Sequence, residues 1–304
     1  MDELFQGIPG TENWASIKLI DRGWSDDIKY HIVTKDNHQL LLRISDISCI
    51  NGKKEGYEAL RSLDSDIMIS KPLDFGTCNN ERSIYMLLTW LEGADAEEIL
   101  PGLANEKQYE LGYKTGQTLR KIHRVPAPSS LPAWSDRFNN KIDRKIRNYE
   151  KCAIKIEKAD RIIKYINSNR YLLENRVQTF QHGDFHIGNM IITEQNEIGI
   201  IDFNRCDYGD PWEEFNRIVW CAKASCYFAS GRINGYFEGK IPDEFFRLLA
   251  LYIGNNTLSS VPWAVPFGDK EVGTMLEQAK DVMDWYSDFD DIIPKWYIPH
   301  NEVR

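Results

Sequence analysis

Three polar side chains between His182 and Phe203 have the types and spacing that phosphoryl transfer requires. Asp184 precedes Asn189 by five residues, and Asp202 follows Asn189 by thirteen. A loop carboxylate can orient a hydroxyl group and accept its proton. Carboxylate and amide oxygens are ligands that Mg²⁺ accepts. The segment therefore predicts a catalytic base at Asp184 and a magnesium site at Asn189 and Asp202.

Short strands and a polar loop are expected to hold these side chains. The polar loop joins residues 179–182 to residues 190–193, and residues 198–203 form a short apolar run that contains an acid. Apolar runs of this length, bounded by polar residues and glycine, are typical of strands. The resulting strand–loop–strand frame would present the loop carboxylate and amide on one side and the second carboxylate at a strand end.

The residues before this frame favour a small part rich in β-structure. We expect strands at residues 17–20, 28–34, 40–44 and 83–91 and a helix at residues 53–63. Residues 72–76 begin with proline and are expected to interrupt the chain. Residues 92–96 follow the last strand and are expected to form a hinge.

Helical spacing of apolar residues dominates the rest of the chain. Helices are expected at residues 109–123, 138–165, 212–229 and 243–255. The sequence therefore predicts an α+β fold with two lobes. Residues 1–92 would form a small lobe around an antiparallel β-sheet, and residues 93–304 a larger, mainly helical lobe.

The composition of the 304-residue chain is typical of a globular protein, and its formal net charge is −9. That charge argues against a nucleic-acid-binding protein and would suit a cationic small substrate. The six cysteines include no Cys-x-x-Cys pair, which favours reduced thiols. Neither a signal peptide nor an apolar run near the roughly 20 residues that cross a bilayer is present. We expect a cytoplasmic protein that binds neither nucleic acid nor membrane.

The motif His182-Gly-Asp184-x-His-x-Gly-Asn189, followed by Ile-Asp202-Phe and Gly-Asp210-Pro, resembles the aminoglycoside phosphotransferase family of small-molecule kinases. This family shares the two-lobed fold of protein kinases, whose catalytic loop has the same spacing of Asp and Asn. The resemblance covers nearly the whole chain. It implies that Asp184 is the base, that Asn189 and Asp202 bind Mg²⁺, that His182 supports the loop and that Asp210 braces it.

The residues expected to bind the nucleotide phosphates resemble those of the family but depart from its pattern at two places. Gly23 and Ser25 are expected to cover the phosphates, although their loop is not Gly-x-Gly-x-x-Gly. Arg43 stands where protein kinases carry lysine, so that a planar fork replaces a point charge. We expect its partner to be Glu55, with Glu58 as the alternative.

The resemblance also implies that the lobe of residues 1–92 binds ATP or GTP. Backbone groups of Thr89 and Leu91, at the end of the strand before the hinge, are expected to contact the adenine. Which of the two nucleotides is preferred stays open.

Candidate substrate residues follow the catalytic motif. Arg205 could face the substrate or a phosphate, or form a surface ion pair. Glu213 and Glu214 could bind a cationic acceptor, or stabilise the first turn of a helix. Aromatic and acidic residues of the last third are expected to line an acceptor pocket: Trp263, Trp285, Tyr286, Asp288, Asp290, Asp291, Trp296 and Tyr297.

The sequence thus predicts a Mg²⁺-dependent enzyme that transfers the γ-phosphate of a nucleotide to a hydroxyl of a small molecule. An aminoglycoside-like antibiotic, hydroxylated and cationic, is the first candidate acceptor. The alternatives are a macrolide or a metabolite such as choline, homoserine or an amino sugar. A further alternative is a kinase-like binding protein without activity. The oligomeric state stays open.

Overall fold

The computed structural model describes residues 3–21 and 26–302, and the chain divides into two compact units. Unit 1 comprises Met1–Ala96 and Asn189–Asp207, and unit 2 comprises Glu97–Gly188 and Tyr208–Arg304. Gly23 and Ser25, predicted to cover the phosphates, lie outside the described residues.

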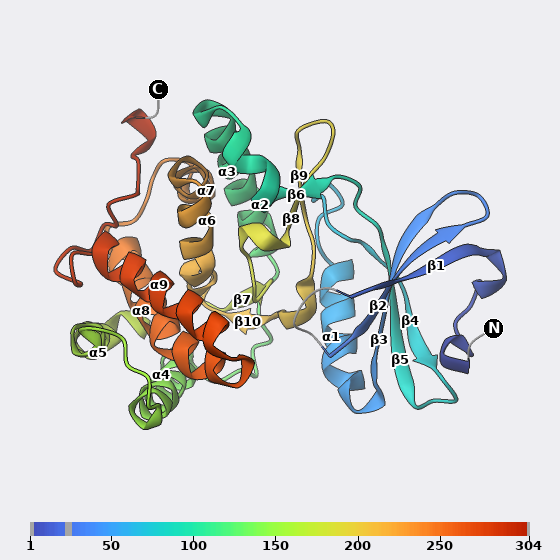
Figure 1. Cartoon of the computed structure of the whole chain (residues 1–304), viewed down its shortest axis with the longest axis horizontal. Helices are drawn as coiled ribbons and strands as arrows, with labels where there is room; N and C mark the ends of the chain where they lie inside the picture. The colour runs from blue at the N-terminus through green and yellow to red at the C-terminus, as the bar shows by residue number, and fades with distance from the viewer. Residues whose placement is uncertain (1–2, 22–25, 303–304) are drawn as a thin grey trace. The chain divides into compact units, whose positions relative to one another are not determined.

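A five-stranded antiparallel sheet with the order β1-β2-β3-β5-β4 forms most of unit 1, accompanied by helix α1 (Figure 1). The elements are β1 (Trp14–Ile20), β2 (Ile28–Thr34), β3 (Gln39–Asp46), α1 (Ile50–Arg61), β4 (Pro72–Cys78) and β5 (Ser83–Thr89). The four predicted strands and the predicted helix are therefore confirmed.

The expected interruption at residues 72–76 is wrong, because these residues belong to strand β4. Within the described residues, this strand lies at the edge of the sheet and pairs with β5 alone. A proline is tolerated at the start of an edge strand, because no neighbour on the outer side needs its missing N–H. The pairing register also shifts between Pro72 and Asp74.

Alternation along β3 decides which side chains face the cavity described below. Leu42 and Ile44 pack into the hydrophobic core with Phe5 and Ile32. Successive strand residues point to opposite faces of a sheet. Arg43, like Leu41 and Ser45, therefore projects from the other face.

A second, three-stranded sheet completes unit 1, in the order β6-β8-β9. Its strands are β6 (Ala94–Asp95), β8 (Met190–Ile192) and β9 (Ile198–Ile200). Gly93, just before β6, has φ 149°, and a Cβ there would lie 2.4 Å from the carbonyl oxygen of Ile192. Only glycine allows this conformation and this close approach.

Unit 2 is mainly helical, and the α+β fold predicted from the sequence is confirmed. Figure 1 shows its elements, and strands β7 and β10 pair within it. The elements are α2 (Ala96–Ile99), α3 (Asn105–Ile122), α4 (Trp134–Lys151), α5 (Ala159–Asn169), β7 (Thr179–Gln181), β10 (Asp207–Gly209), η8 (Glu213–Arg217), α6 (Ile218–Ala224), α7 (Cys226–Phe237), α8 (Asp243–Ala264) and α9 (Asp269–Trp285).

Two predicted helices are in fact broken. The segment 138–165 consists of α4 and α5, separated at residues 152–158. The segment 212–229 begins as the 3₁₀ helix η8 and breaks again at Ser225, which is extended, with φ −161°. The Ser225 side chain accepts a hydrogen bond from the N–H of Phe228 and so caps α7.

Helices α3 and α7 approach each other through glycines. A Cβ at Gly112 of α3 would lie 2.1 Å from the carbonyl oxygen of Phe228, and one at Gly235 of α7 would lie 2.0 Å from that of Tyr113. No other residue fits at these positions without moving a helix.

No helix among the described residues is long and apolar enough to cross a membrane.

Candidate active site

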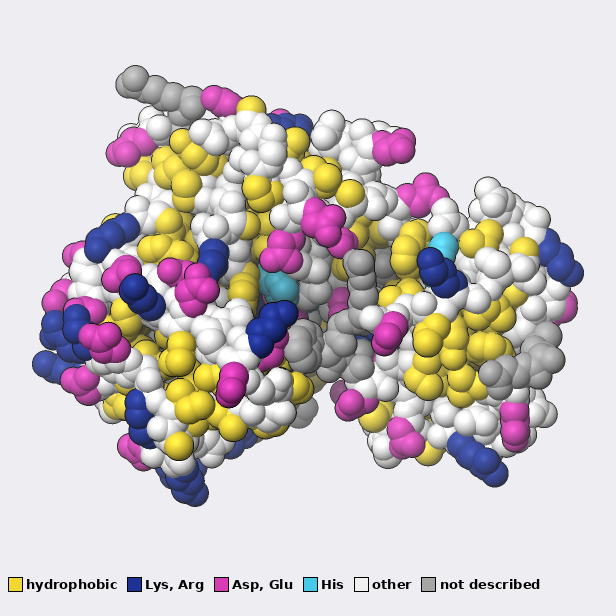
Figure 2. Space-filling model, in the orientation of Figure 1, with side chains coloured by type: hydrophobic (Ala, Val, Ile, Leu, Met, Phe, Trp, Pro, Cys, Tyr) yellow, Lys and Arg dark blue, Asp and Glu magenta, His cyan; other side chains and the backbone are white. Residues whose placement is uncertain are grey.

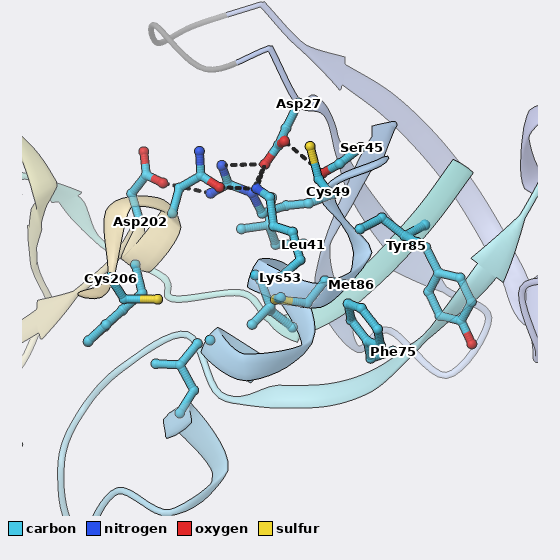
Figure 3. Close-up of a pocket in the computed structure, with 18 of the residues that line it drawn as sticks. Asp27, Leu41, Ser45, Cys49, Lys53, Phe75, Tyr85, Met86, Asp202 and Cys206 are labelled. Carbon is cyan, nitrogen blue, oxygen red and sulfur yellow. Dashed lines mark hydrogen bonds and ion pairs between the residues drawn. The ribbon is translucent and has the colours of Figure 1, made fainter. Parts of the chain in front are cut away.

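A cavity of about 400 Å³ lies within unit 1, between the sheet and α1. Apolar side chains and a group of charged side chains both contribute to its lining, as Figure 3 shows. The apolar lining includes Leu41, Phe75, Met86 and Leu88. A cavity of this size with a few charged groups is typical of a small-ligand site.

Arg43 is buried among the charged lining groups and binds two carboxylates. Its Nε and Nη2 donate to Asp27 Oδ2 at 3.0 and 2.9 Å, and its Nη1 donates to Asp202 Oδ1 at 2.6 Å. One edge of the planar fork therefore rests on Asp27, while the remaining nitrogen contacts Asp202, a predicted metal ligand.

The predicted pair of Arg43 with Glu55 is wrong. Glu55 and its alternative Glu58 are exposed on α1, and Glu58 pairs with Arg61. The helix instead presents a cation, Lys53, whose Nζ donates to Asp27 Oδ2 at 2.7 Å. The reason is helical phase, because only one side of α1 faces the cavity.

Lys53 also links α1 to the segment that follows Asp202. Its Nζ donates a second hydrogen bond to Asn204 Oδ1. Asp27 accepts in addition from Ser45, and Figure 3 shows this carboxylate at the centre of the contacts. Burial raises the pKa of Asp27, but Arg43 and Lys53 lower it more, so the net effect keeps this carboxyl ionised.

The two predicted metal ligands lie next to each other in unit 1. Strand β8 pairs with β9, and the N–H of Ile201 donates to the carbonyl oxygen of Asn189 at 3.0 Å. This pairing brings Asn189 beside the residue that precedes Asp202. Asp202 has φ 64°, a strained conformation for a residue other than glycine, of the kind often found at functional sites.

The donor set at this position suits a hard cation. Asn189 offers an amide oxygen and Asp202 a carboxylate that is 34% exposed. Mg²⁺ uses one or two carboxylates together with waters and substrate phosphates, so it does not need a complete protein cage. A Mg²⁺ ion therefore fits the side chains present.

The backbone groups of Thr89 and Leu91, predicted to contact the adenine, differ from that expectation in their surroundings. The backbone N–H of Thr89 donates to Lys71 O at 2.9 Å, and its hydroxyl accepts from the N–H of Lys71 at 2.8 Å. The backbone N–H of Thr89 is thus used within the protein. Leu91 follows the strand, and its side chain packs against Gly199. Neither Thr89 nor Leu91 is among the residues that line the cavity.

Asp184 lies in the loop after β7, in unit 2, and is 19% exposed. Its backbone N–H donates to His182 Nδ1 at 3.2 Å. Its Oδ1 lies 3.3 Å from Arg217 Nε and 3.7 Å from His186 Nε2. Burial lowers the pKa of His186, although Asp184 raises it, so this imidazole is neutral at pH 7. The carboxylate of the predicted base is therefore partly exposed and has the guanidinium of Arg217 beside it.

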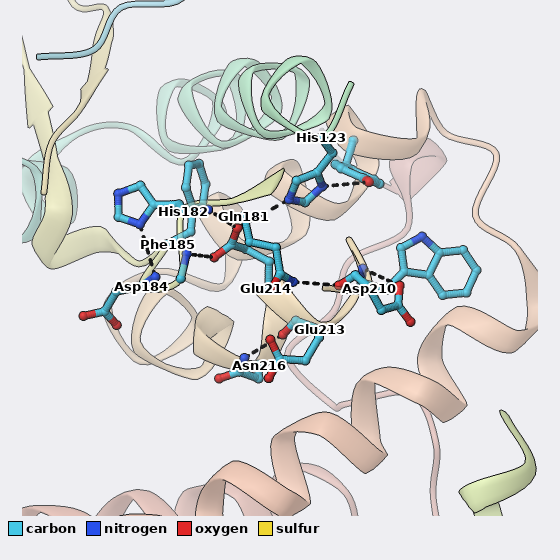
Figure 4. Close-up of polar contacts among 12 residues, drawn as sticks. His123, Gln181, His182, Asp184, Phe185, Asp210, Glu213, Glu214 and Asn216 are labelled. Atoms are coloured by element: carbon cyan, nitrogen blue, oxygen red, sulfur yellow. Dashed lines mark hydrogen bonds and ion pairs between the residues drawn. The ribbon is translucent and has the colours of Figure 1, made fainter. Parts of the chain in front are cut away.

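Glu214 binds the backbone of the loop that carries Asp184, and it is only 2% exposed. Its carboxylate accepts from the backbone N–H groups of His182 and Gly183, each at 2.7 Å (Figure 4). His123 contacts the same carboxylate at 3.4 Å. A buried carboxylate with these partners cannot also bind an acceptor, so the predicted substrate role of Glu214 is wrong.

Arg232 is a loop-supporting residue that the sequence did not reveal. It is fully buried on α7 and donates to the carbonyl oxygens of Phe185 at 2.8 Å and Glu214 at 3.3 Å. Its guanidinium lies over the rings of Phe185 and Phe215, at 4.5 and 4.9 Å from their centroids. Its position in an apolar helix gave no signal, because contacts distant in the chain determine its role.

Asp210 is fully buried, and its carboxylate binds groups outside the loop. Arg176 Nε, Tyr252 Oη and the N–H of Trp212 donate to it at 2.7, 2.6 and 2.9 Å. Its carbonyl oxygen accepts from Gln181, the residue before His182, at 2.8 Å. Asp210 thus contacts the chain next to the loop through its backbone.

Several of the remaining predicted acceptor residues are paired within the protein or buried. Arg205 is exposed in unit 1, and Glu213 binds Lys141 at 2.9 Å in unit 2. Asp288 binds Lys158 at 2.6 Å, and Trp296 is buried. On the face shown in Figure 2, acidic and basic side chains are interspersed. These observations do not support the expected acidic, aromatic acceptor pocket.

A model of the phosphotransferase enzyme family matches residues 16–247 of the chain. Curated protein sequences yield no match. Solved structures similar to the chain include a thermostable mutant of aminoglycoside phosphotransferase APH(4)-Ia, with 16% identity and a TM-score of 0.66 over 90% of this chain and 95% of that one. The ADP-bound aminoglycoside phosphotransferase APH(2'')-Ib gives 18% and 0.62, again over 90% and 95% of the two chains.

The amicoumacin kinase hAmiN in complex with AMP-PNP, Ca²⁺ and Ami is similar to the same extent. Its identity is 13% and its TM-score 0.63, over 93% of this chain and 91% of that chain. At these identities the solved structures establish the fold. They confirm the two-lobed, protein-kinase-like fold that the sequence predicts.

Proposed function

Because the chain belongs to the phosphotransferase enzyme family, a family of small-molecule kinases with alcohol acceptors, we propose that it transfers the γ-phosphate of ATP or GTP to a small hydroxylated molecule with the help of Mg²⁺. The observation that carries this proposal is the position of Asn189 and Asp202. The two residues lie beside each other in unit 1, and Asp202 lines the cavity with Arg43.

Unit 1 supplies the nucleotide side. The apolar lining of the cavity suits a nucleoside, and Arg43 and Lys53 suit its phosphates. Asn189 and Asp202 would hold Mg²⁺, which when bound neutralises charge on the phosphates. We propose that residues 1–92 form the nucleotide-binding lobe and residues 93–304 the catalytic and substrate-binding lobe. Backbone groups near Thr89 and Leu91 would contact the purine ring of the nucleotide.

Asp184 of unit 2 is the proposed base. It would orient the acceptor hydroxyl and accept its proton while the oxygen attacks the γ-phosphorus. A bond forms between that oxygen and phosphorus, the bond from phosphorus to the bridging oxygen breaks, and the nucleoside diphosphate leaves with the bonding electrons. Glu214 and His182 hold the loop, so that Asp184 keeps its place.

The acceptor belongs to one of two candidate classes. Aminoglycosides are the first candidate, since the solved relatives include complexes with gentamicin and streptomycin. The second candidate is a small hydroxylated metabolite. One observation favours it: Glu213, Glu214 and Asp288, which a polycation would need, already have partners within unit 2.

An acceptor screen tests the proposal. The purified protein is given Mg²⁺ and ATP or GTP, and release of nucleoside diphosphate is followed with each acceptor and without any. We expect acceptor-dependent release that stops when Mg²⁺ is chelated. Nucleotide binding without turnover on any acceptor, together with no hydrolysis, would instead identify a kinase-like binding protein without activity.

A further inference from the structure

One cation, Arg217, lies beside the proposed base. Arg217, the last residue of η8, lies 3.3 Å from Asp184 through its Nε, and its side chain is 27% exposed. The outer part of its guanidinium is therefore accessible to a ligand. A planar guanidinium recognises carboxylates and phosphates through two parallel hydrogen bonds.

A second cation, Lys145 of α4, interacts electrostatically with Arg217. It lies one helical turn beyond Lys141, whose Nζ binds Glu213 of η8 at 2.9 Å. Among the residues that the structure describes, Lys145 makes no hydrogen bond and no ion pair. It is half-buried, so its ammonium group has lost part of its hydration without gaining a partner.

The charges near Lys145 do not balance. Lys141, Arg144 and Arg217 all disfavour its charge, and Glu213, which favours it, is already bound to Lys141. Burial first, and these cations second, lower the pKa of Lys145 to about 7. A half-buried cation with this surplus of positive neighbours is stabilised when an anion binds next to it.

We infer that the acceptor carries an anionic group, a carboxylate or a phosphate, that binds Arg217 and Lys145 while a hydroxyl of the same molecule faces Asp184. This inference rests on the proposed phosphotransfer and selects the metabolite class over the cationic antibiotics.

Matched acceptors test the inference with the intact protein, Mg²⁺ and ATP. The neutral compounds are glycerol and glucose, the anionic ones glycerate, gluconate and glucose 6-phosphate, and the cationic ones glucosamine and gentamicin. We expect kcat/KM for at least one anionic acceptor to exceed that of its neutral counterpart about tenfold or more. Comparison of glycerate and gluconate with glucose 6-phosphate shows whether the protein prefers a carboxylate or a phosphate.

Variants tie that preference to the basic residues. Lys145→Met should raise KM for the anionic acceptor about tenfold and leave KM for ATP unchanged. Arg147→Gln, at an exposed cation on the same helix, is the matched control and should change neither constant. Thermal unfolding of both variants checks that they fold.

Two results would overturn the inference. One is a higher kcat/KM for gentamicin or for the neutral compounds than for every anionic acceptor. The other is an anionic preference that Lys145→Met leaves intact. Both would leave the proposed function standing, because that function fails only if the wild-type protein transfers phosphate from Mg²⁺ and ATP to no acceptor at all.

Discussion

Asp27 has a role in the cavity that the sequence suggested for Glu55. Its carboxylate binds the edge of Arg43 and the ammonium of Lys53, and it lies just before β2. The sequence contains no repeating pattern that relates Asp27 to Arg43, so Asp27 was not predicted as its partner. Arg43, Asp184, Asn189 and Asp202 were predicted as site residues because their types and spacing suit the chemistry, and their roles stay predictions.

Asp27→Asn should weaken binding of Mg²⁺ and ATP about tenfold, since Arg43 loses the charged partner that fixes its orientation. Titration calorimetry measures this, with Glu55→Gln as a control that should bind as the wild type does. In an Arg43→Ala background the further effect of Asp27→Asn should be small, because Asp27 would act through Arg43. Equal losses in both backgrounds would contradict this role.

The low pKa of Lys145 predicts a pH dependence of acceptor use. The charges that act on this lysine are those of Lys141 and Arg144 of α4 and of Glu213 and Arg217 of η8. It is charged below a pH of about 7 and neutral above it. The kcat/KM for an anionic acceptor should therefore fall as the pH rises through about 7, because the free enzyme loses this cation. Initial rates between pH 6 and 9 measure the fall, which Lys145→Met should abolish.

At the scale of elements, strands β1, β2, β3 and β5 and helices α1, α3, α4 and α8 were predictable from the periodicity of apolar residues, whereas helix α9 was not predicted. The errors have physical causes. Strand β4 begins with a proline, which is acceptable only at a sheet edge, and no single sequence reveals where the edge lies. The breaks after α4 and after α6 depend on packing and on the cap at Ser225.

The glycine contact between α3 and α7 gives a stability prediction. Gly112→Ala should lower the free energy of unfolding by about 2–3 kcal/mol, since its Cβ would overlap the backbone of α7. Gly273→Ala, on the exposed face of α9 with nothing within 4 Å, is the matched control. It should raise stability by up to about 1 kcal/mol, because alanine favours a helix. Denaturant unfolding measures both, and similar values would refute the close packing.

At the scale of the whole molecule, the proposed roles separate by unit. The nucleotide-side residues Arg43, Asn189 and Asp202 belong to unit 1, and Asp184 and Arg217 belong to unit 2. The segment Asn189–Asp207 joins unit 1 because β8 pairs with β6. Removal of the base should therefore leave nucleotide binding in place.

The most direct test of the central claim compares Asp184→Ala with the wild type in two assays. With the best acceptor of the screen, the variant should lose turnover by roughly 10²–10⁴-fold, since the hydroxyl has no group to accept its proton. In calorimetry it should bind Mg²⁺ and ATP as tightly as the wild type does. Phosphoryl transfer by Asp184→Ala at a rate near that of the wild type would contradict the account.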